Sequence, residues 1–236
     1  MSQFDREPIM RTGSSTAIDQ GLKTFMSKVY GYMMLGLLIT GISASLIASN
    51  PQLLIAIFSS PLKYVLLFAP FGLVMFLQFR IHKIQSSTAQ LLFLGYAALL
   101  GMSLSVIFIS YKLGSVFNIF LVSASVFGTM SLYGYTTKKD LTSMGSFLFM
   151  ALMGLIVASL INIFMRNSMM DMLLSCITVL IFTGLTAYDT QMIKQIYYDS
   201  DSYEVGTKKA VIGALALYLD FINIFLSLLR LFGERK

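Results

Sequence analysis

The segment ALALYLDFINIFLSLLR, residues 214–230, is apolar enough to cross a membrane and yet carries Asp220 near its middle. A membrane-spanning helix needs about 20 mostly apolar residues. A charged carboxylate at the centre of such a helix costs roughly 2.5 to 3.5 kcal/mol on insertion scales. We therefore expect a membrane helix on which Asp220 faces protein or water rather than lipid.

One face of this segment is small and polar from end to end, whereas every other position from 214 to 229 is Ala, Leu, Ile, Phe or Tyr. Steps of three and four residues place the small and polar side chains on a common helical face. They are Gly213, Ala216, Asp220, Asn223, Ser227 and Arg230. Small residues let membrane helices pack closely, but a packing seam needs no acid. The face therefore predicts a seam or a pore lining, and it marks Asp220 as a functional candidate.

The whole chain has the composition of a polytopic membrane protein. Of its 236 residues, 56% are hydrophobic and 12% are charged, and the mean hydropathy is +0.77. A soluble domain is nearer half apolar and a quarter charged. We predict an all-α bundle of seven transmembrane helices, forming one domain over residues 25–236 after a polar, disordered tail over residues 1–24. Pro61 favours a later start of the second span, and Pro70 is expected to kink it. The expected spans are 27–49, 54–79, 88–111, 114–136, 145–165, 171–193 and 209–232.

The positive charges lie in the loops between apolar segments, so the net charge of +6 does not indicate a nucleic-acid-binding patch. Placing the N-terminus in the cytoplasm puts most of the 17 Lys and Arg residues on the cytoplasmic side, as the positive-inside rule requires. Arg230, Arg235 and Lys236 oppose a seventh crossing, so the sequence leaves open whether the last helix crosses or re-enters. His82 and Cys176 are alone of their kinds, which excludes an internal disulfide and clusters of His or Cys ligands.

A second acid lies near the end of the sixth apolar segment, in FTGLTAYDTQMIK (182–194). At about 1.5 Å per residue, Asp189 and Asp220 differ in depth by roughly 10 Å or less. The two acids can therefore meet if the sixth and seventh helices are neighbours, and Thr186 shares the helical face of Asp189. Arg80, at the cytoplasmic end of the second span, is the other candidate partner. A structural Asp–Arg pair that only holds the bundle together is the alternative.

Three stretches carry a resemblance to the bacterial members of the Bax inhibitor, or transmembrane BAX inhibitor motif, family: TGLTAYDTQMIK (183–194), ALALYLDFINIFLSLLRLFG (214–233) and, more weakly, KKDLTSMGSFL (138–148). The resemblance implies a seven-helix bundle with the C-terminal helix at its centre. It also implies a calcium leak across the membrane, gated by pH through Asp189 and Asp220. FLQFR makes Arg80 the counterpart of the basic residue that latches one of these acids in the family.

Two functions from different classes follow from these features. The first is a pH-sensitive calcium leak channel in the bacterial inner membrane, in which Asp189 and Asp220 share a proton and titrate as a unit. The same two carboxyl groups would bind Ca²⁺ weakly and transiently. The second is a non-conducting regulatory protein that binds a membrane protease or another integral membrane protein, with the polar tail as its contact arm. The direction of the pH response remains open because it depends on the geometry of the pore.

Two acids on neighbouring membrane helices are also a feature of intramembrane aspartyl proteases. By resemblance, those enzymes carry one acid in a G-x-G-D pattern, which TAYDT (186–190) and LYLDF (217–221) lack. We therefore expect no enzymatic activity and no cofactor. The expected partners are the lipid bilayer, calcium ions as the transported species and, in the second reading, another membrane protein.

Overall fold

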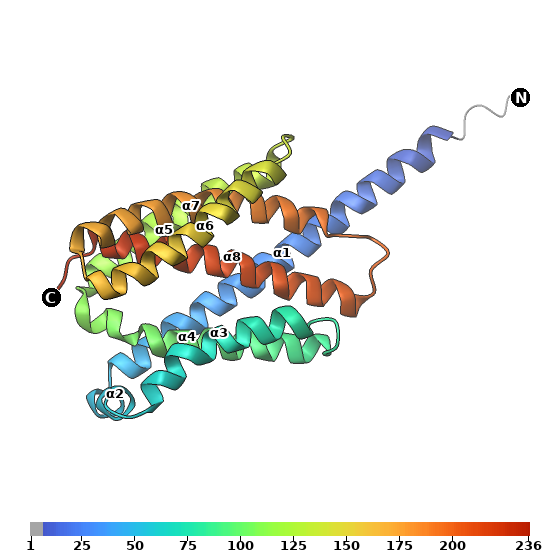
Figure 1. Cartoon of the computed structure of the whole chain (residues 1–236). Helices are drawn as coiled ribbons and strands as arrows, with labels where there is room; N and C mark the ends of the chain where they lie inside the picture. The colour runs from blue at the N-terminus through green and yellow to red at the C-terminus, as the bar shows by residue number, and fades with distance from the viewer. Residues whose placement is uncertain (1–6) are drawn as a thin grey trace, which may run out of the picture.

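The computed structural model describes residues 7–236, with side chains from residue 20 onward, and this part of the chain folds as a bundle of helices (Figure 1). Seven of the helices, all except α2, are long and apolar enough to cross a membrane, and in α1 the span covers Gln20–Ala48. The prediction of an all-α polytopic membrane protein is therefore confirmed. The helices are α1 (Glu7–Ala48), α2 (Pro51–Phe58), α3 (Leu62–Arg80), α4 (Ser86–Ser110), α5 (Leu113–Thr136), α6 (Thr142–Met165), α7 (Ser168–Gln195) and α8 (Tyr203–Phe232).

The C-terminal helix α8 occupies the centre of the bundle. In its most apolar window 72% of the residues are buried, compared with 11–28% in the other six spans. It packs against α7, α1, α5 and α4, and Figure 1 shows it running between α5, α6 and α7 on one side and α3 and α4 on the other. A helix that is largely apolar all round is stable only where neighbours or lipid surround it. Here the other helices supply that cover.

The predicted span over 54–79 is corrected, because two helices occupy this region. The short helix α2 is capped by Asn50, whose side chain accepts hydrogen bonds from the backbone at its start, and none of its residues is buried. Pro61 then precedes α3. Proline has no N–H to donate and disfavours helical backbone at the residue before it, so the first helix ends ahead of it. The spanning helix is α3 alone, which continues through Pro70.

Helix α1 begins at Glu7, inside the range 1–24 for which the sequence predicts a polar tail. Leu22 packs against the core, and the ring of Phe25 lies 5.4 Å from that of Tyr197, just after α7. These apolar contacts hold the start of the membrane-spanning part of α1 against the end of α7. Residues 1–6 lie outside the described residues.

The last helix crosses the bundle completely. Its 30 residues reach about 45 Å at about 1.5 Å per residue, more than the roughly 30 Å of a hydrocarbon core. Beyond it, Lys112 N donates to Glu234 O at 2.9 Å and Lys236 N donates to Ser110 O at 3.1 Å. The chain crosses the bundle three times, in α5, α6 and α7, between this α4–α5 turn and the start of α8. The two ends of α8 therefore lie at opposite ends of the bundle (Figure 1).

Candidate functional site: an aspartate pair between two helices

Helices α7 and α8 pack along their length and bring the two predicted acids together. The carboxyl groups of Asp189 and Asp220 lie within side-chain hydrogen-bonding reach of one another. Two ionised carboxylates offer only acceptors, so a hydrogen bond between them requires a proton on one of them. A proton shared between the two acids is compatible with this arrangement and stays a prediction.

Asp220 is the more deeply buried member of the pair. Only 3% of its surface is exposed, and its Oδ2 has no hydrogen-bond partner among the described residues, whereas Asp189 is half-buried. Burying a charged oxygen without a donor is costly. The site therefore favours a neutral Asp220 or a positive ligand beside it. Asp189 is the more exposed of the two carboxyl groups.

A row of hydroxyl groups lies next to the pair and connects three helices. Thr190 Oγ1 donates to the backbone oxygen of Thr186 and lies 3.0 Å from Ser131 Oγ on α5. Ser131 Oγ in turn lies 2.6 Å from the Tyr30 hydroxyl on α1. Thr186 itself is fully buried. The sequence marked Thr186 but gave no indication of the other three, because their contacts join segments that are far apart along the chain.

Two glycines hold α7 close to its neighbours just before Asp189. A side chain at Gly134 of α5 would collide with the backbone of Ala187, and one at Gly145 of α6 would collide with the ring of Tyr188. At neither position can a larger residue fit without movement of α7. Helix α7 therefore approaches α5 at Ala187 and α6 at Tyr188, which are two residues and one residue before Asp189.

Two of the three stretches that resemble the family contact each other at this end of α7. Gln191 Nε2 donates to Lys139 O at 2.8 Å, and Leu141 N donates to Gln191 Oε1 at 2.9 Å. The amide of Gln191 thus satisfies both a carbonyl and an N–H of the α5–α6 loop. This contact gives the stretch 138–148 a positioning role for α7, which the sequence did not indicate.

The small and polar face of α8 lies partly in a seam with α7. An added carbon at Gly213 would come within 3.1 Å of the Ile193 side chain, so this position is a close contact. Ser227 is buried, whereas Ala216 and Asn223 are half-buried and Asn223 Nδ2 donates to its own helix at Leu219 O. Whether these positions line a pore stays a prediction.

The apolar side of α8 is buried as well. Leu215, Leu217 and Tyr218 are fully buried, and the Tyr218 hydroxyl lies 2.6 Å from Thr40 Oγ1 of α1. The sequence pattern distinguished a small, polar face from an apolar one. It did not show that other helices cover both faces of α8. A face that packs on helices and a face that contacts lipid carry the same apolar residues, so the sequence does not distinguish them.

Arg80 is exposed at the end of α3 and does not contact the pair in this conformation. Helix α3 packs mainly against α4, with a smaller contact to α2. Among the side chains from residue 20 onward, Arg80 takes part in none of the ion pairs, which are Lys112–Glu234, Lys208–Glu204 and Lys209–Asp201. The predicted latch between Arg80 and an acid therefore requires a conformation other than this one, and it stays a prediction.

The described side chains hold no group of three or more His, Cys, Asp or Glu residues that could bind a metal ion. Calcium takes six to eight oxygen ligands in its tighter sites. Two carboxyl groups with nearby hydroxyl and carbonyl oxygens provide a weaker and more transient set. The predicted role of Asp189 and Asp220 toward calcium is compatible with this arrangement and remains a prediction.

Comparison with known proteins places the chain in a family. Residues 22–236 match the family described as Inhibitor of apoptosis-promoting Bax1. The chain belongs to this Bax inhibitor family. It is 42% identical to inner membrane protein YbhL of Escherichia coli K12, over 99% of this chain and 100% of YbhL. It is also 44% identical to protein RP147 of Rickettsia prowazekii, over 95% of each chain, and 46% identical to a protein of Borreliella burgdorferi, over 90% of this chain.

Proposed function

We propose that this Bax inhibitor family protein is a calcium leak pathway in the bacterial inner membrane, and that the Asp189–Asp220 pair is its pH-responsive gate. The proposal rests above all on the contact between two carboxyl groups inside a bundle of membrane-spanning helices. Ionisable residues inside a membrane are costly and mark ion or proton pathways in many transporters. Localisation to the inner membrane is supported by the name of the relative YbhL.

The gate works through the number of protons on the pair. With one shared proton, the hydrogen bond ties α7 to α8. When that proton leaves, two negative charges in a medium of low dielectric repel each other. The half-buried Asp189 then moves toward Arg80 or offers its oxygens to Ca²⁺, with the hydroxyl groups of Thr186 and Thr190 nearby. Weak binding of this kind suits conduction, because the ion must also leave.

We infer that the N-terminus and the pair-bearing end of α7 face the cytoplasm. The loops at that end carry most of the Lys and Arg residues, which favours the cytoplasmic side. The residues at the opposite end are drawn into contacts with the protein: Arg235 lies 6.0 Å from the Tyr111 ring and Lys236 Nζ donates to Phe108 O. These contacts hold the two cations against the protein without neutralising them, and the Lys112–Glu234 ion pair offsets one positive charge at that end.

Calcium flux into liposomes that contain only this protein tests the proposal. Flux is measured from about pH 5 to 9 for the wild type, Asp189→Asn and Asp220→Asn. Each Asn keeps the size and hydrogen bonding of the acid but cannot ionise. We expect the wild-type flux to change with pH and both variants to lose that change. Asp199→Asn, in the exposed loop after α7, is the matched control and should keep the wild-type profile.

A regulatory role without conduction is the second candidate. It is favoured by α1, which extends past the ends of the other helices in Figure 1 and would offer a contact for a membrane protease or another integral protein. The flux experiment separates the two functions. Wild-type liposomes that show no calcium flux at any pH would contradict the leak pathway and favour the regulatory role.

A further inference from the structure

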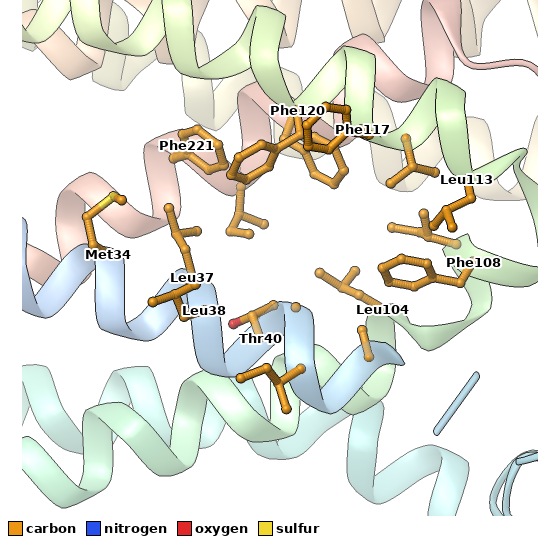
Figure 2. A pocket seen from close by; sticks show the side chains of 17 residues that line it. Met34, Leu37, Leu38, Thr40, Leu104, Phe108, Leu113, Phe117, Phe120 and Phe221 are labelled. Atoms are coloured by element: carbon orange, nitrogen blue, oxygen red, sulfur yellow. The ribbon is translucent and has the colours of Figure 1, made fainter. Parts of the chain in front are cut away.

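An apolar cavity of about 410 Å³ lies beside the central helix, between α1, α4, α5 and α8. Figure 2 shows side chains from these helices surrounding it, with the Thr40 hydroxyl as the one labelled polar group. The cavity is lined by the second half of α1, the first half of α5 and the second half of α8. It therefore lies in the half of the membrane opposite the N-terminus.

The lining changes from exposed to buried across the cavity. At its rim, Leu38 of α1 and Phe117 of α5 are each 60% exposed on the outer surface of the bundle. At its floor, Val116 is 7% exposed and Phe221 of the central helix is 3% exposed. Helices α1 and α5 each pack on α8, and their direct contact through Tyr30 and Ser131 lies toward the other end of the bundle. The cavity is therefore a lateral opening from the surface that faces lipid to the centre of the bundle.

The lining of this cavity offers almost no hydrogen-bond partners for water. The only hydroxyl in its lining, that of Thr40, already lies 2.6 Å from the Tyr218 hydroxyl and 3.0 Å from Ala97 O. A buried water needs two to four polar partners, and apolar cavities without them stay dry and take up apolar molecules. An empty space of this size would forfeit many packing contacts. Hydrocarbon is the matching content, and the surrounding membrane supplies it.

We propose that this cavity binds one acyl chain of a membrane phospholipid, which enters between α1 and α5 from the leaflet opposite the N-terminus. The chain lies against Phe221, whose ring packs 5.3 Å from Phe120 and 5.7 Å from Phe127. Phe221 directly follows Asp220 in α8. The bound chain therefore supports the central helix next to the acid pair, and it does so whether or not the protein conducts calcium.

Photolabelling identifies the occupant. The full-length protein is reconstituted in vesicles of phosphatidylethanolamine and phosphatidylglycerol with a small share of phosphatidylethanolamine that carries a diazirine within one acyl chain. After illumination, labelled residues are mapped by mass spectrometry. We expect labels on the floor residues Phe221 and Val116, which lipid on the outer surface does not reach. Labels confined to rim residues such as Leu38 and Phe117 would overturn the proposal, and so would cross-links to a second copy of the chain at the floor.

A matched pair of glycine substitutions tests the site itself. Gly41 lines the cavity, and a Cβ added there meets no other atom within 4 Å, so the larger side chain of Gly41→Phe is expected to occupy the opening. Gly31 of the same helix has equally open surroundings but does not line the cavity, and Gly31→Phe is the control.

We expect Gly41→Phe to lose the labelling of Phe221 and Gly31→Phe to keep it. Unchanged labelling of Phe221 in Gly41→Phe would overturn the proposal. Size-exclusion chromatography establishes that each variant is folded. If Gly41→Phe does not fold, the smaller Gly41→Leu gives the same test.

Discussion

The two ends of α8 are held to the bundle in different ways. Toward its start, α8 meets α7 through the close contact at Gly213 and through Asp220, which is proposed to share a proton with Asp189. Just past Asp220, Phe221 and Phe225 pack on aromatic rings of α5 and border an apolar cavity. The first end depends on close backbone approach and, in the function proposed above, on protonation. The second depends on apolar volume, so different substitutions should disturb each end.

The largest effect is expected at the apolar end. Phe221→Ala removes ring contacts with Phe120 and Phe127 and enlarges the cavity beside them. Truncating a buried Phe costs about 3 to 5 kcal/mol. We expect the greatest loss of thermal stability in detergent among these variants. Phe164→Ala, at a position 87% exposed to the surroundings, is the control. Similar melting temperatures for the two variants would contradict the packing described for Phe221.

A smaller effect is expected from crowding the polar end. Gly134→Val pushes α5 away from the Ala187 backbone, two residues before Asp189, and overpacking of this kind costs about 1 to 3 kcal/mol. Gly128→Val lies on the same helix with nothing within 4 Å and is the matched control. Thermal melting should separate the two variants. A Gly134→Val protein as stable as Gly128→Val would show that α7 is not fixed by this contact.

The smallest effect is expected in the loop before α6, outside the membrane. Asp140 accepts hydrogen bonds from Thr142 N at 2.9 Å and from its hydroxyl at 2.6 Å, and these bonds lower the pKa of Asp140 below its usual value. A lowered pKa in the folded state gives stability that is present at neutral pH and is lost as the pH falls through that pKa. Asp140→Ala should therefore melt slightly below the wild type at pH 7, with the difference vanishing in acid. A difference that persists at low pH would point to a cause other than charge.

The membrane spans and the two acids within them could be recognised from sequence because both depend on local patterns. Apolar runs of the right length indicate membrane helices, and an acid within such a run stands out. Pro61 favoured a later start of the second span, but a separate helix α2 was not foreseen, because it depends on the Asn50 cap. The helix over residues 20–24 was missed because its stability comes from contacts with Tyr197, far along the chain.

Other parts of the site could not be predicted because they arise only when distant helices meet. The hydroxyl groups of Tyr30, Ser131 and Thr190 come from three helices, and no spacing in the sequence relates them. The central position of α8 was implied by family resemblance rather than by its own pattern. The contact predicted for Arg80 is absent in this conformation, since α3 packs on α4 rather than on α7.

A shared proton between Asp189 and Asp220 is the central claim, and infrared difference spectroscopy tests it most directly. Protein with isotope-labelled aspartate is reconstituted in lipid at neutral pH, and absorption from a protonated carboxyl group is compared among the wild type, Asp189→Asn and Asp220→Asn. We predict a protonated-carboxyl band in the wild type that is shifted or lost in both variants, because each variant removes one of the two carboxyl groups that share the proton. A wild type without such a band, or a band that Asp189→Asn leaves unaltered, would contradict the shared proton.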